Sequence, residues 1–202
     1  MPRRSDIQTR VRLAQEAARI MREQAIQDFG TAKRKARERL GLADTVPLPK
    51  NTEIEAELRR AQSLFDGDEH AARIDRLRAV AGRAMRVLAE FRPRLVGPVL
   101  AGTATEHAAV NLHLFADPAE RVALALMERG IDYRSFERRL RMRNGEPLSD
   151  LPGFAFSAEG VELELTVFPE ISVRQAPLSP VDGRPMRRAS LRELEALLAA
   201  GA

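Results

Sequence analysis

The chain has 202 residues, of which 44% are hydrophobic and 4% aromatic, and its formal charge is +4. It contains no cysteine, which excludes disulfides, thiolate nucleophiles and cysteine-based zinc sites. The scarcity of aromatic rings argues against stacking platforms for single-stranded nucleic acid. No apolar run approaches the roughly 20 residues of a membrane-spanning helix, and the first ten residues lack an apolar signal region. We therefore expect a cytoplasmic protein with no membrane partner.

Four helices are predicted in the first part of the chain. Apolar residues recur at helical spacing over 5–24 and 31–41, and again in stretches that begin at Thr52 and at Gly67. Thr52 and Glu55 match a capping box. The second helix carries a dense basic run: Lys33, Arg34, Lys35, Arg37 and Arg39. We expect residues 1–91 to form a basic helical module.

Strand patterns begin after Arg92-Pro93. Apolar or alternating runs predict strands over 94–101, 109–115, 132–142, 153–157 and 161–168. A helix is predicted from Asp117, and a final one from the Ser190–Glu193 cap. Residues 92–202 are thus expected to form a mixed β-sheet domain with a C-terminal helix. The fold class is α+β, with a helical module in front of the sheet domain.

The stretch from Gly97 to Phe115 is the most informative for function. Alternation in "VNLHLF" sends Asn111 and His113 to one face of a strand and the leucines to the other. Two polar side chains two residues apart can converge on one point, which is how paired carboxylates hold metal ions in phosphoryl transfer. The glycine-containing turn before the strand would let backbone N–H groups approach phosphate oxygens.

This arrangement resembles the nucleotidyltransferase superfamily of polymerase-beta-like enzymes. Gly97-Pro98 stands in the place of the Gly-Ser turn, and Asn111-Leu112-His113 stands where the paired acids belong. The resemblance makes Gly97, Gly102 and Thr103 the candidates for phosphate binding. It also implies a third acid from a later strand, and "VELELTVF" offers Glu162 and Glu164. The catalytic candidates are accordingly Asn111, His113, Glu162 and Glu164.

Nearly the whole chain is also similar to a set of uncharacterised proteobacterial proteins. The shared segments are "AKRKARERLG", "FRPRLVGPVLAGTA", "LHLFAD" and "SPVDGRPMRR". This second resemblance implies no biochemical activity of its own.

The departures from the superfamily pattern favour a protein without catalysis. Pro98 lacks the hydroxyl and the N–H of serine. Asn111 is a neutral, weak ligand for Mg²⁺, and His113 suits Zn²⁺ better than Mg²⁺. We expect no cofactor and no metal site, with Mg²⁺ bound only if the site is active. The expected function is a catalytically degenerate, nucleotidyltransferase-like protein with a nucleotide-binding, phosphate-binding or interaction role.

Several alternatives remain open from the sequence. The site could be an active metal-dependent nucleotidyltransferase with atypical ligands, or Asn111 and His113 could be polar residues on a solvated sheet face. The protein could also bind nucleic acid through its basic helix, whose bland interpretation is a solvated face. Arginines on both faces of 132–142 favour an edge strand, and a phosphate-facing role competes with that interpretation. The sequence does not determine the oligomeric state.

Overall fold

The computed structural model describes residues 4–24, 26, 28–65 and 67–201. It divides into two compact units. The helical unit comprises Met1–Ala71 with the short segments Thr103–Ala108 and Pro180–Asp182, and the sheet unit comprises the remainder. The sequence predicts a boundary at residue 91, whereas the units divide near residue 71, so most of the fourth helix groups with the sheet. The fold is α+β, with helices and one mixed sheet.

The helical unit contains α1 (Arg4–Glu23), α2 (Phe29–Arg39) and α3 (Asn51–Phe65). Asp28 caps α2 by accepting a hydrogen bond from the Thr31 N–H at 2.7 Å. The three helices bury one apolar stripe each, because the spacing of their apolar residues places these on a single face. The shared core is made of Leu13, Ala14, Ala17, Ala18, Ile20, Met21, Ala32, Ala36, Ile54 and Leu58.

The sheet has five strands in the order β1-β2-β5-β4-β3. They are β1 (Arg94–Val96), β2 (Val110–Phe115), β3 (Arg134–Arg141), β4 (Leu148–Ala158) and β5 (Val161–Phe168). β2 runs parallel to β5, and the other neighbours are antiparallel. β3 is an edge strand, as its arginines predicted.

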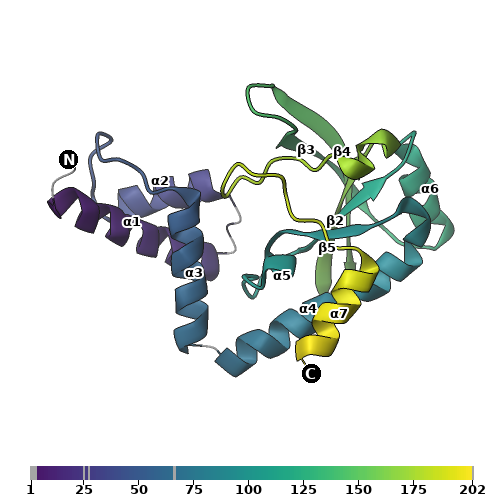
Figure 1. Ribbon diagram of the computed structural model, residues 1–202, viewed down its shortest axis with the longest axis horizontal. Coiled ribbons are helices and arrows are strands. Elements are labelled where there is room, and N and C mark those ends of the chain that lie inside the picture. The colour runs from purple at the N-terminus through teal and green to yellow at the C-terminus, as the bar shows by residue number, and fades with distance from the viewer. Residues whose placement is uncertain (1–3, 25, 27, 66, 202) are drawn as a thin grey trace. The chain divides into compact units, whose positions relative to one another are not determined.

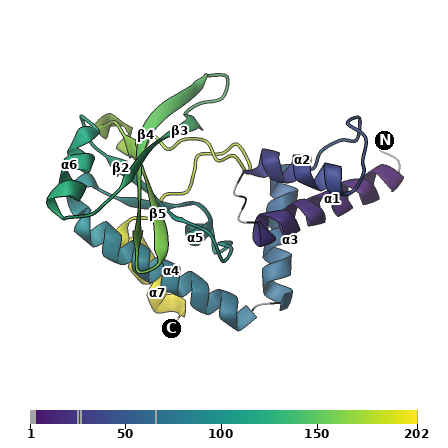
Figure 2. The same cartoon turned by 180° about the vertical axis from the view of Figure 1, so that it is seen from behind.

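Helices accompany the sheet along one side (Figures 1 and 2). They are α4 (Gly67–Val87) and α7 (Leu191–Gly201), which meet where Gly82 faces Leu191 and Leu194. The short helices η1 (Ala89–Phe91) and α5 (Gly97–Ala101) flank β1, and α6 (Glu120–Glu128) follows β2. The connection from β5 to α7 includes η2 (Glu170–Arg174). The described residues contain no helix long and apolar enough to cross a membrane.

Three local predictions were wrong. The strand expected over 94–101 ends at Val96, because Gly97 adopts a φ of +73° and Pro98 begins the helix α5. The capping box expected at Thr52 is shifted, since α3 starts at Asn51 and Glu53 accepts the Lys50 N–H at 2.6 Å.

The helix expected from Asp117 begins at Glu120 instead. Asp117 accepts a hydrogen bond from the Glu170 N–H at 2.8 Å and does not cap that helix. The capping box at Ser190 was predicted correctly: its N–H donates to the Glu193 carboxylate at 2.7 Å.

Candidate functional site

The polar candidates of β2 and β5 lie side by side on one face of the sheet. The parallel register places Asn111 opposite Glu164, and His113 opposite Thr166. Paired residues of neighbouring strands project to the same side of a sheet, and period-two alternation adds Glu162 to that side. The expected convergence of Asn111, His113 and Glu164 on one face is therefore confirmed. Asn111 and His113 are buried, at 6% and 3% exposure, so they do not lie on a solvated face.

An arginine from the edge strand binds two of the four candidates at once. Arg138 Nη1 donates to Asn111 Oδ1 at 3.0 Å, while its Nη2 donates to the Glu164 carboxylate. We name these three residues the Arg138 cluster. Asn111 also donates its amide to the Ala109 carbonyl at 3.1 Å, so both ends of its side chain are occupied. The guanidinium of Arg138 thus occupies the space between the amide and the carboxylate.

The fourth candidate, Glu162, lies further out on the same face. It accepts a hydrogen bond from Arg134, whose guanidinium is also 3.9 Å from Glu164. Arg134 and Arg138 both lie over the ring of Phe136, at 5.9 and 5.2 Å from its centroid. Each glutamate of this face is therefore matched by an arginine of β3.

A second arginine binds His113. Arg188 Nε donates to His113 Nδ1 at 3.0 Å, and its Nη1 donates to the carbonyls of Ser172 and Gln175, both at 3.1 Å. The guanidinium also lies over two rings, 5.0 Å from the centroid of Phe115 and 4.7 Å from that of Phe168. We name His113, Arg188, Phe115 and Phe168 the Arg188 cluster.

No carboxylate of the part of the chain that the structure describes balances the charge of the Arg188 cluster. Burial holds the pKa of His113 well below its usual 6.5, and the charges of Arg188 and Arg138 lower it further. His113 is therefore a neutral acceptor at neutral pH. Burial, with a contribution from nearby Arg94, lowers the pKa of Arg188 to about 10, which still leaves it charged. Its Nη2 is buried with no hydrogen-bond partner among the described residues.

The expected phosphate-binding residues divide between two places. Gly97 lies against Asn111: a Cβ at this position would be 3.6 Å from Asn111 Nδ2, and the φ of +73° favours glycine. Gly102 ends α5, and its N–H donates to the Pro98 carbonyl. Thr103 is buried in the segment Thr103–Ala108, which groups with the helical unit. Gly97 is thus the candidate that the structure places beside Asn111.

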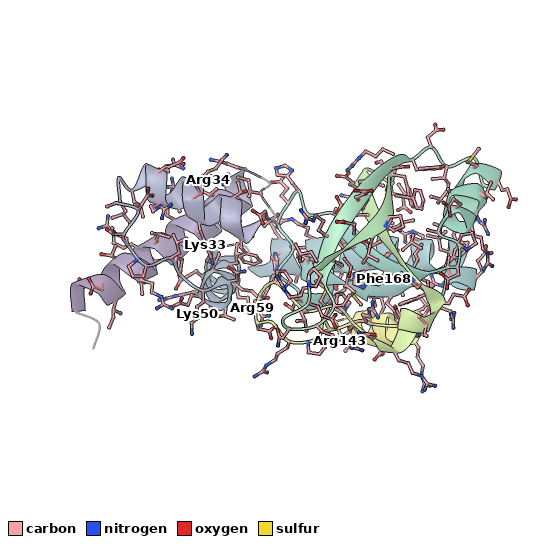
Figure 3. The ribbon with its side chains drawn as sticks, turned by 90° about the horizontal axis from the view of Figure 1, so that it is seen from above. Lys33, Arg34, Lys50, Arg59, Arg143 and Phe168 are labelled. Carbon is pink, nitrogen blue, oxygen red and sulfur yellow. The ribbon has the colours of Figure 1, made fainter. Side chains whose placement is uncertain are left out.

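The basic residues of α2 are largely bound within the helical unit. Lys35 donates to Gln24 at 3.0 Å, Arg37 pairs with Asp44 at 3.0 Å, and Arg39 pairs with Glu16 at 3.3 Å. Burial lowers the pKa of Lys33, while Glu53 and Asp28 oppose that shift. Figure 3 shows Lys33 and Arg34 on this helix. The run does not form a single open row of unengaged cations.

The side chains on this face do not fit a Mg²⁺ ion. Mg²⁺ requires several oxygen ligands, usually including carboxylates. Here the oxygen of Asn111 and the carboxylate of Glu164 both accept from Arg138, and His113 offers a nitrogen that already accepts from Arg188. In the described part of the chain, no three His, Asp or Glu side chains are grouped so that they could hold a metal ion.

Comparison of the chain with family models, with curated proteins and with solved structures finds no match.

Arg138 and Arg188, which bind the polar candidates of this face, were not among the site residues expected from the sequence. The arginines of 132–142 were interpreted as marks of an edge strand, with a phosphate-facing role as the competing interpretation, and Arg188 was given no role. A signal for Arg138 was present in the alternation of β3, which places Arg134 and Arg138 on one face. No comparable pattern marks Arg188.

Proposed function

We propose that the chain is a nucleotidyltransferase-like protein that binds a nucleotide or another phosphate ligand without metal-dependent transfer. The observation that carries the proposal is the position of Arg138, which donates to both Asn111 and Glu164. In the arrangement that the sequence resembles, the corresponding positions are acids that hold divalent cations. An arginine there supplies a fixed positive charge of protein origin.

The charges of the face support an anionic ligand. Four arginines lie on or over this face and two glutamates oppose them; the arginines are Arg94, Arg134, Arg138 and Arg188. Guanidinium groups present planar pairs of N–H donors that match phosphate oxygens. Arg134 and Arg138 still have N–H groups beyond those that Glu162 and Glu164 accept. A phosphate that reaches Arg134 and Arg138 would therefore be held without a metal ion.

The experiment that tests the proposal is a calorimetric titration of the pure protein with ATP, in EDTA and again with Mg²⁺. We expect binding that needs no Mg²⁺ and that weakens several-fold in Arg134→Gln and Arg138→Gln. Arg139→Gln is the matched control, because Arg139 lies on the same strand, alternates to the other face and pairs with Asp150 at 3.2 Å.

A transfer assay separates this proposal from the enzymatic alternative. The protein is incubated with Mg²⁺ or Mn²⁺, labelled nucleoside triphosphates and cell extract, and no label is expected on any acceptor. Label that is transferred, and that is lost in Glu164→Gln or Asn111→Ala, would identify an active nucleotidyltransferase. An absence of ATP binding in the calorimeter would remove the phosphate-binding role.

A further inference from the structure

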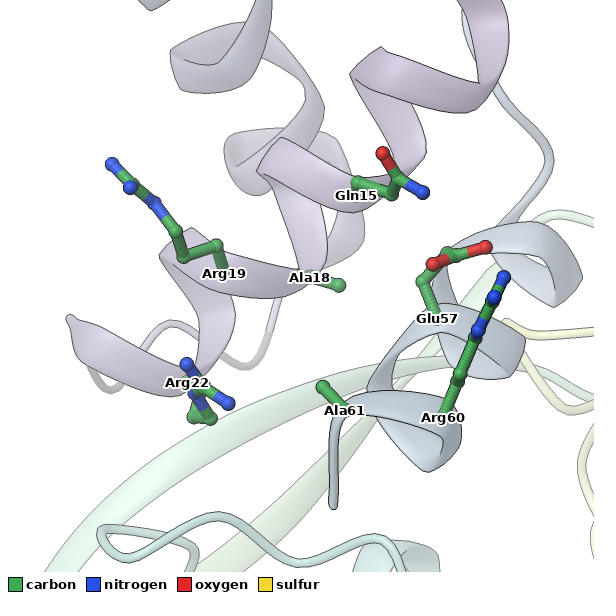
Figure 4. A pocket seen from close by; sticks show the side chains of 7 residues that line it. All are labelled: Gln15, Ala18, Arg19, Arg22, Glu57, Arg60 and Ala61. Carbon is green, nitrogen blue, oxygen red and sulfur yellow. The ribbon is translucent and has the colours of Figure 1, made fainter. Parts of the chain in front are cut away.

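A groove in the helical unit is lined by arginines that were not among the site residues expected from the sequence. It lies between α1 and α3 and has a volume of about 260 Å³. Ala18 of α1 and Ala61 of α3 line its centre, and their small side chains leave the space open. Figure 4 shows Arg22 and Arg60 on either side of Ala61, with Arg19 directed away from α3.

The charges around the groove are unevenly matched. Arg19 lies 3.4 Å from Glu16 and 3.7 Å from Glu23, so its charge is largely compensated on its own helix. Glu57 is the one acid among the described residues that line the groove, and it lies on α3 one turn before Arg60. Arg22 is half-buried and forms no ion pair or hydrogen bond with another described residue. The groove therefore has a positive excess centred on a guanidinium without a carboxylate.

The basic residues of α2 differ from Arg22 in how their charges are engaged. Three of the five basic residues of α2 are bound to side chains of the same unit. A ligand that used them would have to displace Gln24, Asp44 or Glu16. Arg22 requires no such exchange, so an anion meets a lower cost there than at Lys35, Arg37 or Arg39.

We propose that the groove binds a phosphate group, with Arg22 and Arg60 as its donors. A guanidinium pairs with phosphate oxygens through two parallel N–H donors, which makes arginine the side chain best suited to this ligand. The volume lies below the roughly 300 Å³ at which drug-sized ligand pockets begin. It therefore suits one phosphate and its immediate substituent, and the rest of the ligand extends into solvent. The phosphate belongs to a free nucleotide or to the backbone of a nucleic acid.

The test uses the full chain with two probes, sodium pyrophosphate and a fluorescently labelled single-stranded oligonucleotide. In NMR spectra of the arginine Nε–H groups, both probes should shift the signals of Arg22 and Arg60. Arg22→Gln and Arg60→Gln should each weaken binding at least about tenfold, as expected for a lost charge-assisted hydrogen bond. For the oligonucleotide, each variant should also reduce the salt slope by about 0.7.

Matched variants make the outcome decisive. Arg59→Gln removes the neighbouring exposed arginine of α3, which pairs with Glu55 at 3.2 Å, and should bind like the unmodified chain. Arg138→Gln should retain groove binding, which separates this site from the sheet face. A pyrophosphate response without oligonucleotide binding identifies a free phosphate ligand, and a response to both identifies a nucleic acid. Unshifted Arg22 signals with both probes, or an equal loss in Arg59→Gln, would overturn the proposal.

Discussion

The two arginine clusters on the sheet face differ in how the positive charge is compensated. Arg138 meets the carboxylate of Glu164 and the amide of Asn111, so its charge is paired. Among the described residues, Arg188 meets only neutral acceptors and two aromatic rings. A half-buried charge without a carboxylate partner depends on the hydrogen bonds and ring contacts around it. We therefore expect the Arg188 cluster to contribute more to stability than the Arg138 cluster, whose charge pair can be exchanged for a ligand.

The sharpest test of this difference is Arg188→Ala, which should have the largest effect. It leaves His113 Nδ1 and two carbonyls without their donor and removes the contact with Phe115 and Phe168. We expect a loss of about 3 kcal/mol in the free energy of unfolding, because His113 is buried, the two carbonyls are half-buried, and each acceptor left unpaired costs about 1 kcal/mol. Urea denaturation measures it.

The neighbouring arginine provides the control. Arg187 is exposed, and Arg187→Ala should change stability by no more than about 0.5 kcal/mol. Equal effects of the two substitutions would show that the contacts of Arg188 contribute little, and the comparison between the clusters would fail.

The second test uses pH and the Arg188 cluster. The folded chain keeps His113 neutral, whereas the unfolded chain binds a proton there near pH 6.5. Proton uptake by the unfolded state alone makes the folded state less stable as the pH falls below 6.5. The slope reaches up to about 1.4 kcal/mol per pH unit until the lowered folded-state pKa is reached.

Denaturation curves between neutral pH and about pH 5 measure this slope, in the range where histidine titrates. His113→Gln keeps an acceptor for Arg188 and should flatten the curve. His107→Gln, at an exposed histidine, should leave the slope as it is. A slope that is unchanged in His113→Gln would mean that other groups cause it.

The smallest effect is expected in the Arg138 cluster. Glu164→Gln keeps an oxygen acceptor for Arg138 but removes the charge, and we expect a loss of about 1 kcal/mol. Glu162→Gln should cost less than about 0.5 kcal/mol, because an exposed ion pair contributes little. The side chain of Glu162 is 50% exposed and that of Glu164 is 16% exposed. Thermal unfolding of both variants measures the difference, and a reversed order would show that burial does not govern these pairs.

The sequence predicted the strands better than the contacts between them. Alternation located β2 and β5 and the face that carries Asn111, because side-chain direction follows from strand geometry alone. The turn at Gly97 was not predicted, because its apolar neighbours also fit a strand. In the structure, Gly97 has a positive φ and Pro98 begins a short helix. Patterns of residue type do not distinguish these two outcomes over five residues.

The partners of Arg138 and Arg188 could not be predicted in the same way. Arg138 of β3 and Asn111 of β2 are separated by the strands β4 and β5. Arg138 can contact Asn111 only because the registers of these strands bring the two residues to the same level of the sheet. Arg188 reaches His113 across 75 positions of sequence. Such contacts depend on where each connection returns to the sheet, and local propensity carries no information about that path.

The bridge between Leu95 and Ala189 has a consequence for the order of assembly. Their backbone groups exchange two hydrogen bonds, of 2.8 and 2.9 Å, along the outer edge of β1. Ribosomal synthesis proceeds from the N-terminus, so all five strands emerge before Arg188 and Ala189. Until then β1 presents unpaired N–H and C=O groups, which invite pairing with another nascent chain. We therefore expect Ala189 to cover the edge of β1 late in synthesis and to limit intermolecular pairing there.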